Sequence, residues 1–111
     1  MNHVKKTKSN ASKQFQQMEE VSKLYFVALK HVNNHSVLHD SEETYDEYKE
    51  YLAKVREAWF QLDDLEKTII NNEYFYQDYP YWWEKIYSRS SFYRLKRISV
   101  AKFLEAFGYE A

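Results

Sequence analysis

The sequence predicts an all-α protein built as a five-helix bundle, with an N-terminal helical hairpin followed by a C-terminal unit of three helices. Apolar residues recur at spacings of three and four along most of the chain, which is typical of helices with one buried face. One glycine and one proline leave few residues suited to tight turns, which argues strongly against an all-β fold. A length of 111 residues, with 44% hydrophobic and 30% charged residues, suits a single domain that folds in water.

The N-terminal part is expected to form a polar tail and then the hairpin. Residues 1–11 predict a flexible tail, and residues 12–61 predict the hairpin. The apolar face of the first helix consists of Phe15, Met18, Val21, Tyr25, Ala28, Leu29 and Val32. Ser41 is a good N-cap for the second helix because two glutamates follow it in the first turn. The apolar face of that helix consists of Tyr45, Tyr48, Leu52, Val55 and Trp59.

Residues 62–111 predict the three-helix unit. Asp63 and Glu66 have the spacing of a capping box, so a third helix is expected from Asp64 to about Tyr76. Proline is well placed to open a helix, which predicts a short fourth helix over residues 80–86. Ser88 is expected to cap the final helix, from Arg89 to Phe107, and Gly108 to end it.

Charge is distributed unevenly, although the net charge is only −1. Residues 40–66 carry ten acids against three bases, for a net charge of −7. Residues 85–111 carry six bases against two acids, for +4, and no acid lies between Lys85 and Lys102. A polyanion is therefore expected to be attracted to the C-terminal end and repelled by the middle of the chain.

The final helix has the pattern of a recognition helix, so the last three helices are expected to be helix-turn-helix-like. Such a helix buries one face and presents polar and basic side chains to the DNA major groove near its N-terminus. At about 100° per residue, Ser90, Arg94 and Arg97 lie opposite the apolar arc of Phe92 and Phe103. Arg89, Ser91 and Lys96 flank them. The same pattern is also typical of an amphipathic helix that only faces solvent, and the pattern alone favours neither interpretation.

The segment from Ile86 to Arg97, followed by Ala101, Phe103 and Leu104, resembles the recognition helix of proteins related to the promoter-binding C-terminal domain of sigma factors. The similarity is closest to the ArpU and RinA regulators of phages and to small proteins of mycoplasmas and other low-GC bacteria. The upstream run Leu62, Leu65, Glu66, Lys67, Ile69 and Ile70 is similar to the first helix of that domain. The resemblance covers about residues 62–107 and does not include the hairpin.

The resemblance implies roles for individual residues of the final helix. It implies that Ser88 caps this helix and that Phe92, Leu95 and Phe103 hold it against the third helix. The residues that it places toward nucleic acid are Arg89, Ser90, Ser91, Tyr93, Arg94, Lys96 and Arg97, with Tyr93 and Lys96 on phosphates. The chain departs from the family pattern at residues 79–85, where two tryptophans replace small residues, so the last two helices are expected to cross differently.

The aromatic run of residues 74–83 has two interpretations. Exposed rings can stack on the bases of single-stranded nucleic acid. A small domain with few long aliphatic residues also needs aromatic rings for its core, and this interpretation is preferred for Phe75, Tyr79, Trp82 and Trp83. The positions of Tyr74, Tyr76 and Tyr81 stay open.

Other candidate chemistry is weak. His31, His35 and His39 are spaced by four residues, with Asp40 beside them, but the two asparagines between them indicate that the helix ends there, so surface histidines are preferred over a metal site. The acids of the second helix are expected to form a solvated face, without the burial that catalysis requires. Without cysteine, a nucleophile motif or a glycine-rich loop, neither an enzyme, a cofactor nor a bound metal is expected.

The sequence therefore predicts a small DNA-binding transcriptional regulator. Double-stranded DNA is the expected partner, RNA polymerase is a candidate partner, and a homodimer is a candidate assembly. A cytoplasmic location is expected, because nothing reads as a signal peptide or a membrane segment. The alternative is a protein-interaction module without enzymatic activity, such as an RNA polymerase-associated factor on the same scaffold.

Overall fold

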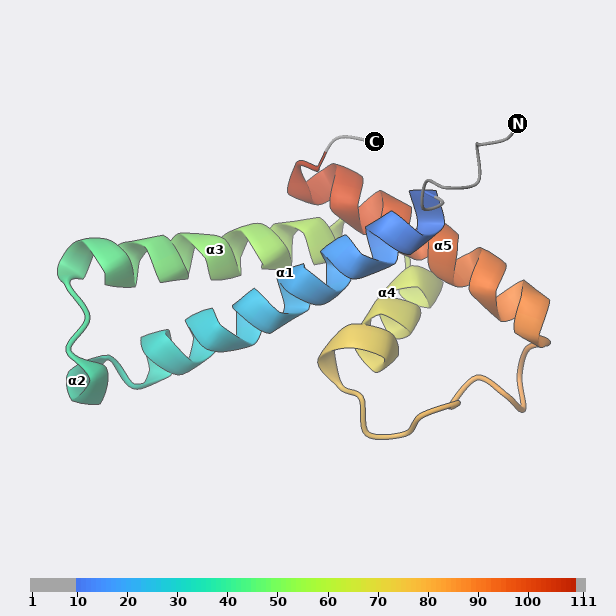
Figure 1. Ribbon diagram of the computed structural model, residues 1–111, viewed down its shortest axis with the longest axis horizontal. Helices are drawn as coiled ribbons and strands as arrows, with labels where there is room; N and C mark the ends of the chain where they lie inside the picture. Colours follow the sequence, from blue (N-terminus) through green and yellow to red (C-terminus); the bar gives the residue numbers. More distant parts are fainter. Residues whose placement is uncertain (1–9, 110–111) are drawn as a thin grey trace, which may run out of the picture.

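The computed structural model describes residues 10–109 and confirms the all-α class (Figure 1). Five α-helices and one π-helical turn occur within this range, and it contains no strand. They are α1 (Asn10–Asn33), α2 (His35–Leu38), α3 (Glu42–Phe60), α4 (Asp64–Ile70), the π-helical turn η2 (Asn71–Phe75) and α5 (Arg89–Phe107). No helix in residues 10–109 combines the length and the apolar character needed to cross a membrane.

Helices α1 and α3 form the predicted antiparallel hairpin, with the short helix α2 at its tip. The side chain of Ser41 accepts a hydrogen bond of 3.1 Å from the backbone N–H of Thr44, so the predicted cap of α3 is confirmed. Helix α1 begins at Asn10, so the end of the predicted tail is helical. The rest of that tail, residues 1–9, lies outside the described residues.

The capping box at α4 is also confirmed. The Asp63 carboxylate accepts a hydrogen bond of 2.8 Å from the Glu66 N–H, and the Glu66 carboxylate accepts one of 2.9 Å from the Asp63 N–H. Helix α4 continues without a break into η2, so the predicted third helix extends to Phe75.

The predicted helix over residues 80–86 is wrong, because these residues form consecutive turns. Hydrogen bonds of 3.2, 3.0 and 2.9 Å join the N–H groups of residues 82, 84 and 86 to carbonyls three residues earlier. Tyr81 has a φ of +59°, in the left-handed region that a right-handed helix cannot include. This turn lets both Trp82 and Trp83 pack inward, against Phe92.

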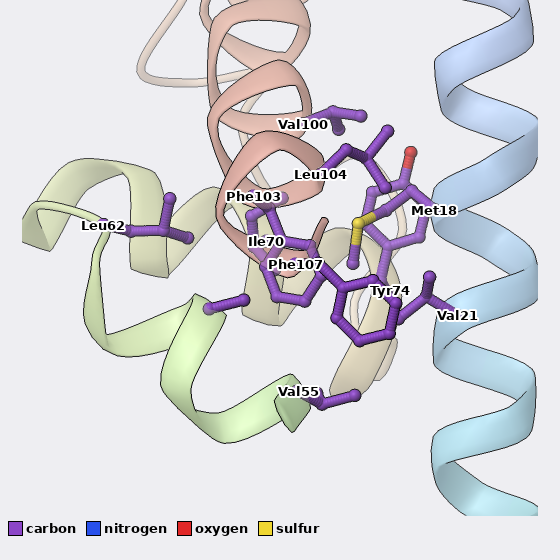
Figure 2. Packing of buried hydrophobic residues seen from close by; sticks show 11 residues of the cluster. Met18, Val21, Val55, Leu62, Ile70, Tyr74, Val100, Phe103, Leu104 and Phe107 are labelled. Carbon is purple, nitrogen blue, oxygen red and sulfur yellow. The ribbon is translucent and has the colours of Figure 1, made fainter. Parts of the chain in front are cut away.

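One hydrophobic core joins the hairpin to the C-terminal half (Figure 2). Helix α5 packs against α1, α3 and α4. The buried residues of this cluster are Met18, Val21, Val55, Ala58, Leu62, Ile70, Tyr74, Val100, Phe103, Leu104 and Phe107. The C-terminal half of α5 is therefore fixed on three sides.

A second, aromatic cluster fixes the N-terminal half of α5. Phe92 is fully buried and stacks on Trp83, with ring centroids 4.4 Å apart and planes 6° apart. Ile69 of α4 lies in the same cluster, and Leu95 packs against it. Phe92, Leu95 and Phe103 thus lie on the inner side of α5, as expected.

Candidate nucleic-acid interface

The outer side of the N-terminal half of α5 carries arginines. Ser88 caps the helix by accepting a hydrogen bond of 3.2 Å from the Ser91 N–H. Because Phe92 faces inward, the positions of Ser90, Arg94 and Arg97 face outward, and all three side chains are exposed. Arg89, in the first turn, is exposed as well. We call Arg89, Ser90, Arg94 and Arg97 the arginine face.

The arginine face is not neutralised by acids of the same molecule. Within residues 10–109, the ion pairs are Lys49–Asp46, Lys96–Glu73 and Lys102–Glu66, His31 lies 2.7 Å from Asp40, and none of these contacts includes an arginine. The acids of α3 therefore do not fold against Arg94 or Arg97. The first turn of α5 contains no acid, although the helix dipole favours negative charge there. This local arrangement of positive charges is one that a bound anion would stabilise.

Two of the six bases in the C-terminal end are used internally. The Nζ atom of Lys102 lies 2.9 Å from Glu66 Oε2, and this hydrogen bond and charge raise the pKa of Lys102. Lys96 lies 2.8 Å from Glu73 Oε1, and its ammonium also lies over the rings of Phe15 and Tyr74. The side chains of Lys96 and Glu73 are only 14% and 16% exposed. Lys96 is therefore removed from the expected nucleic-acid contacts.

Ser91 and Tyr93 lie beside the arginine face rather than on it. Ser91 is half-buried and supplies the capped N–H of the first turn. Tyr93 is half-buried and contacts the Trp83 ring edge-on, with centroids 6.0 Å apart. The guanidinium of Arg89 lies 5.8 Å from the centre of the Tyr93 ring. Tyr93 forms a shallow basic hollow with Ser88, Arg89, Ser90 and Arg97.

The segment between η2 and α5 exposes three tyrosines that the sequence analysis had not assigned to the surface. Tyr79 was expected in the core, but its side chain is 78% exposed, which corrects that prediction. Tyr81 is 65% exposed and Tyr76 is 64% exposed, whereas Tyr74 is buried and its burial raises the pKa of its hydroxyl. Trp83 is buried, and Phe75 and Trp82 are half-buried. The order of residues carried no signal for this division, because every position in the run except Pro80 is aromatic or polar.

The three histidines do not converge on one point. Nδ1 of His31 lies 2.7 Å from Asp40 Oδ2, the ring of His35 lies 3.9 Å from that of Tyr45 at a tilt of 31°, and His39 ends α2 with a φ of +55°. Across residues 10–109, no group of three or more histidine or acidic side chains is arranged to hold a metal ion. The contacts of His31 and His35 instead join the tip of the hairpin.

Comparison of the chain with protein-family models, with curated proteins and with solved structures finds no match. The functional argument therefore rests on the side chains of this protein.

Proposed function

We propose that this protein is a small DNA-binding transcriptional regulator that contacts double-stranded DNA through the arginine face of α5. The observation that carries the proposal is the absence of any acidic partner for Arg89, Arg94 and Arg97 among the described residues. Arginine bonds phosphates and the guanine edge through two donors at once. The proposed role is non-enzymatic, needs no cofactor and belongs in the cytoplasm.

The rigidity of α5 supports this proposal. The aromatic cluster holds the inner side of the helix, so the arginines leave a fixed backbone. Because residues 80–86 form turns, the helix that normally precedes a recognition helix is replaced by a loop. The proposed contact with duplex DNA therefore depends on α5 itself and on its first turn.

Single arginine substitutions test the proposal. We expect R94A and R97A each to weaken binding to duplex DNA about fivefold and to reduce the slope of log affinity against log salt by about 1, because each removes one phosphate contact. The measurement is fluorescence anisotropy of labelled genomic duplexes between about 50 and 200 mM salt.

The matched control is R56A, since Arg56 is an exposed arginine on α3, outside the arginine face. It should bind duplex DNA like the parent protein. Parent protein that shows no salt-sensitive binding at micromolar concentration, or R94A and R97A that bind like R56A, would refute the proposal.

A second candidate function is a protein-interaction module, which a groove on another side of the molecule favours. The groove lies between α1, α3 and η2, has a volume of about 440 Å³ and is mainly apolar. Its lining includes Tyr25, Phe26, Trp59, Phe60 and Phe75. An apolar segment of a partner protein suits this lining, and RNA polymerase is the candidate from the sigma-like resemblance.

Affinity purification from cells separates the two functions. Nuclease treatment should release partners that are held through DNA, whereas partners held in the groove should remain bound and be lost with F60S. A homodimer is tested by sedimentation of the purified protein at two concentrations, since self-association makes the apparent mass rise with concentration.

A further inference from the structure

Two hollows lie side by side at the start of α5, and Tyr93 lines both of them. The first is the basic hollow described above. The second, which we call the aromatic hollow, has a volume of about 380 Å³ and lies under the loop before α5. Its lining residues are Asn72, Glu73, Gln77, Tyr79, Pro80, Tyr81, Trp83 and Tyr93. The aromatic hollow thus offers aromatic rings and amide groups, and the basic hollow offers guanidinium groups.

The Tyr81 and Tyr93 rings of the aromatic hollow are held in place by contact with the buried Trp83. Trp83 is buried against Phe92, and it contacts Tyr81 and Tyr93 edge-on at centroid distances of 6.2 and 6.0 Å. The Tyr79 and Tyr81 side chains are nevertheless mostly exposed. An anchored but solvent-facing ring is suited to stacking on a planar ligand, because little side-chain entropy is lost on binding.

The backbone at Tyr81 is strained. The N–H of Trp82 bonds the carbonyl of Tyr79 at 3.2 Å, which closes a four-residue turn with Pro80 and Tyr81 in the middle. The φ of +59° at Tyr81 is a conformation that glycine adopts without penalty and that a bulky side chain rarely adopts. Strain of this kind is commonly found where a side chain has a functional role.

The one acid that lines the hollows is paired within the protein. Among the described residues that line the two hollows, Glu73 is the only acid. Its Oε1 lies 2.8 Å from Lys96 Nζ, and its Oε2 accepts a hydrogen bond of 2.9 Å from Trp82 Nε1. Glu73 is therefore paired within the protein, and Arg89 and Arg97 remain free of ion pairs in the described chain.

We propose that the aromatic hollow and the basic hollow together bind an unpaired nucleotide of a nucleic-acid strand. The base stacks on Tyr79 and Tyr81 in the aromatic hollow, and the adjacent phosphate bonds Arg89 and Arg97. Aromatic stacking beside a basic groove is the general chemistry of single-strand binding. This inference rests on the proposed function, because it uses the same arginines, and it extends that function from duplex DNA to an unpaired strand.

Two tyrosine substitutions test the inference. Binding of a labelled 12-nucleotide oligo(dT) and of the equivalent oligo(rU) is measured by fluorescence anisotropy. Loss of one stacking ring should weaken binding of either strand about tenfold in Y79A and in Y81G. Duplex binding should change by less than about twofold in both variants, since the rings do not contact a paired base.

The Y81G variant distinguishes the loss of a stacking ring from a loss of folding stability. Glycine relieves the left-handed φ, so the melting temperature should stay equal to that of the parent protein or rise. The matched control is Y76A: Tyr76 has similar exposure but lines the apolar groove, not the aromatic hollow, so this variant should bind both oligonucleotides like the parent.

The outcomes separate this inference from the proposed function. Weaker strand binding in Y79A and Y81G, with normal binding in Y76A, supports the nucleotide site, and the tighter of the two oligonucleotides identifies a DNA or RNA strand. Normal strand binding in both variants overturns the inference, and the proposed function survives if R94A still weakens duplex binding. Parent protein that binds neither strand nor duplex overturns both.

Discussion

Glu73 is the residue at which the polar contacts of the C-terminal half meet. Its carboxylate accepts hydrogen bonds from Lys96 of α5 and from the indole N–H of Trp82, so one side chain joins η2 to α5 and to the loop before α5. The sigma-like resemblance implied that Lys96 contacts phosphate, and helical spacing placed it beside Arg94 and Arg97. Local spacing could not reveal its partner, which lies 23 positions earlier in the chain.

The Glu73–Lys96 pair predicts the stability of the E73Q variant. E73Q keeps the shape of the side chain but removes its charge, so the largely buried ammonium of Lys96 loses its counter-ion. Removing one partner of a buried pair is destabilising by about 3 kcal/mol. The free energy of unfolding, measured by urea denaturation, should fall by an amount of this order.

The matched control for E73Q is the double variant E73Q/K96M. Methionine keeps an apolar stem against Phe15 and Tyr74 and leaves no unpaired charge. Most of the lost stability should return in the double variant. A double variant as unstable as E73Q would show that the ion pair does not carry the effect.

The sequence predicts helix ends correctly where a short-range pattern of residues marks them. The serine caps of α3 and α5, the capping box of α4 and the glycine after α5 are short-range patterns, and each is found in the structure. The segment before α5 was assigned wrongly because a proline permits a helix to begin but does not require it. What decides this segment is the packing of Trp82 and Trp83 against Phe92, a tertiary contact.

The cap of α5 predicts the stability of the S88A variant. S88A removes the oxygen that accepts from the Ser91 N–H, and such a loss lowers the free energy of unfolding by about 1 kcal/mol. S90A is the matched control, because Ser90 is an exposed serine two residues further along in the same turn, and it should change stability by less than about 0.5 kcal/mol. Equal stability of S88A and the parent in thermal unfolding would contradict the assigned cap.

At the scale of the whole molecule, the hairpin and the C-terminal half share one core. Met18 of α1 is fully buried in the same cluster as Phe103 and Leu104 of α5. The sequence separated residues 12–61 from residues 62–111, and it could not show that α5 crosses both halves, because helical periodicity gives the buried face of a helix but not its neighbour. The shared core means that neither half has a complete interior of its own.

This arrangement predicts that the protein unfolds as one unit. M18A should lower the free energy of unfolding by about 2–5 kcal/mol, the range for truncating a buried long side chain. Tryptophan fluorescence and far-ultraviolet circular dichroism should lose their native signals in a single coincident transition. L24A, which alters a side chain of the same helix that is 42% exposed, should have a much smaller effect. Two separate transitions would contradict the shared core.

The separation of charge between the two ends of the molecule gives it an electric dipole. The acidic first turn of α3 lies at the hairpin tip, and the arginine-bearing start of α5 lies at the opposite end, along an axis of 52 Å (Figure 1). A polyanion exerts a torque on such a molecule and turns the start of α5 toward itself before contact. For the proposed DNA partner we therefore expect encounters to begin with the start of α5 toward the DNA, and the rate constant of association to fall as added ions screen this torque.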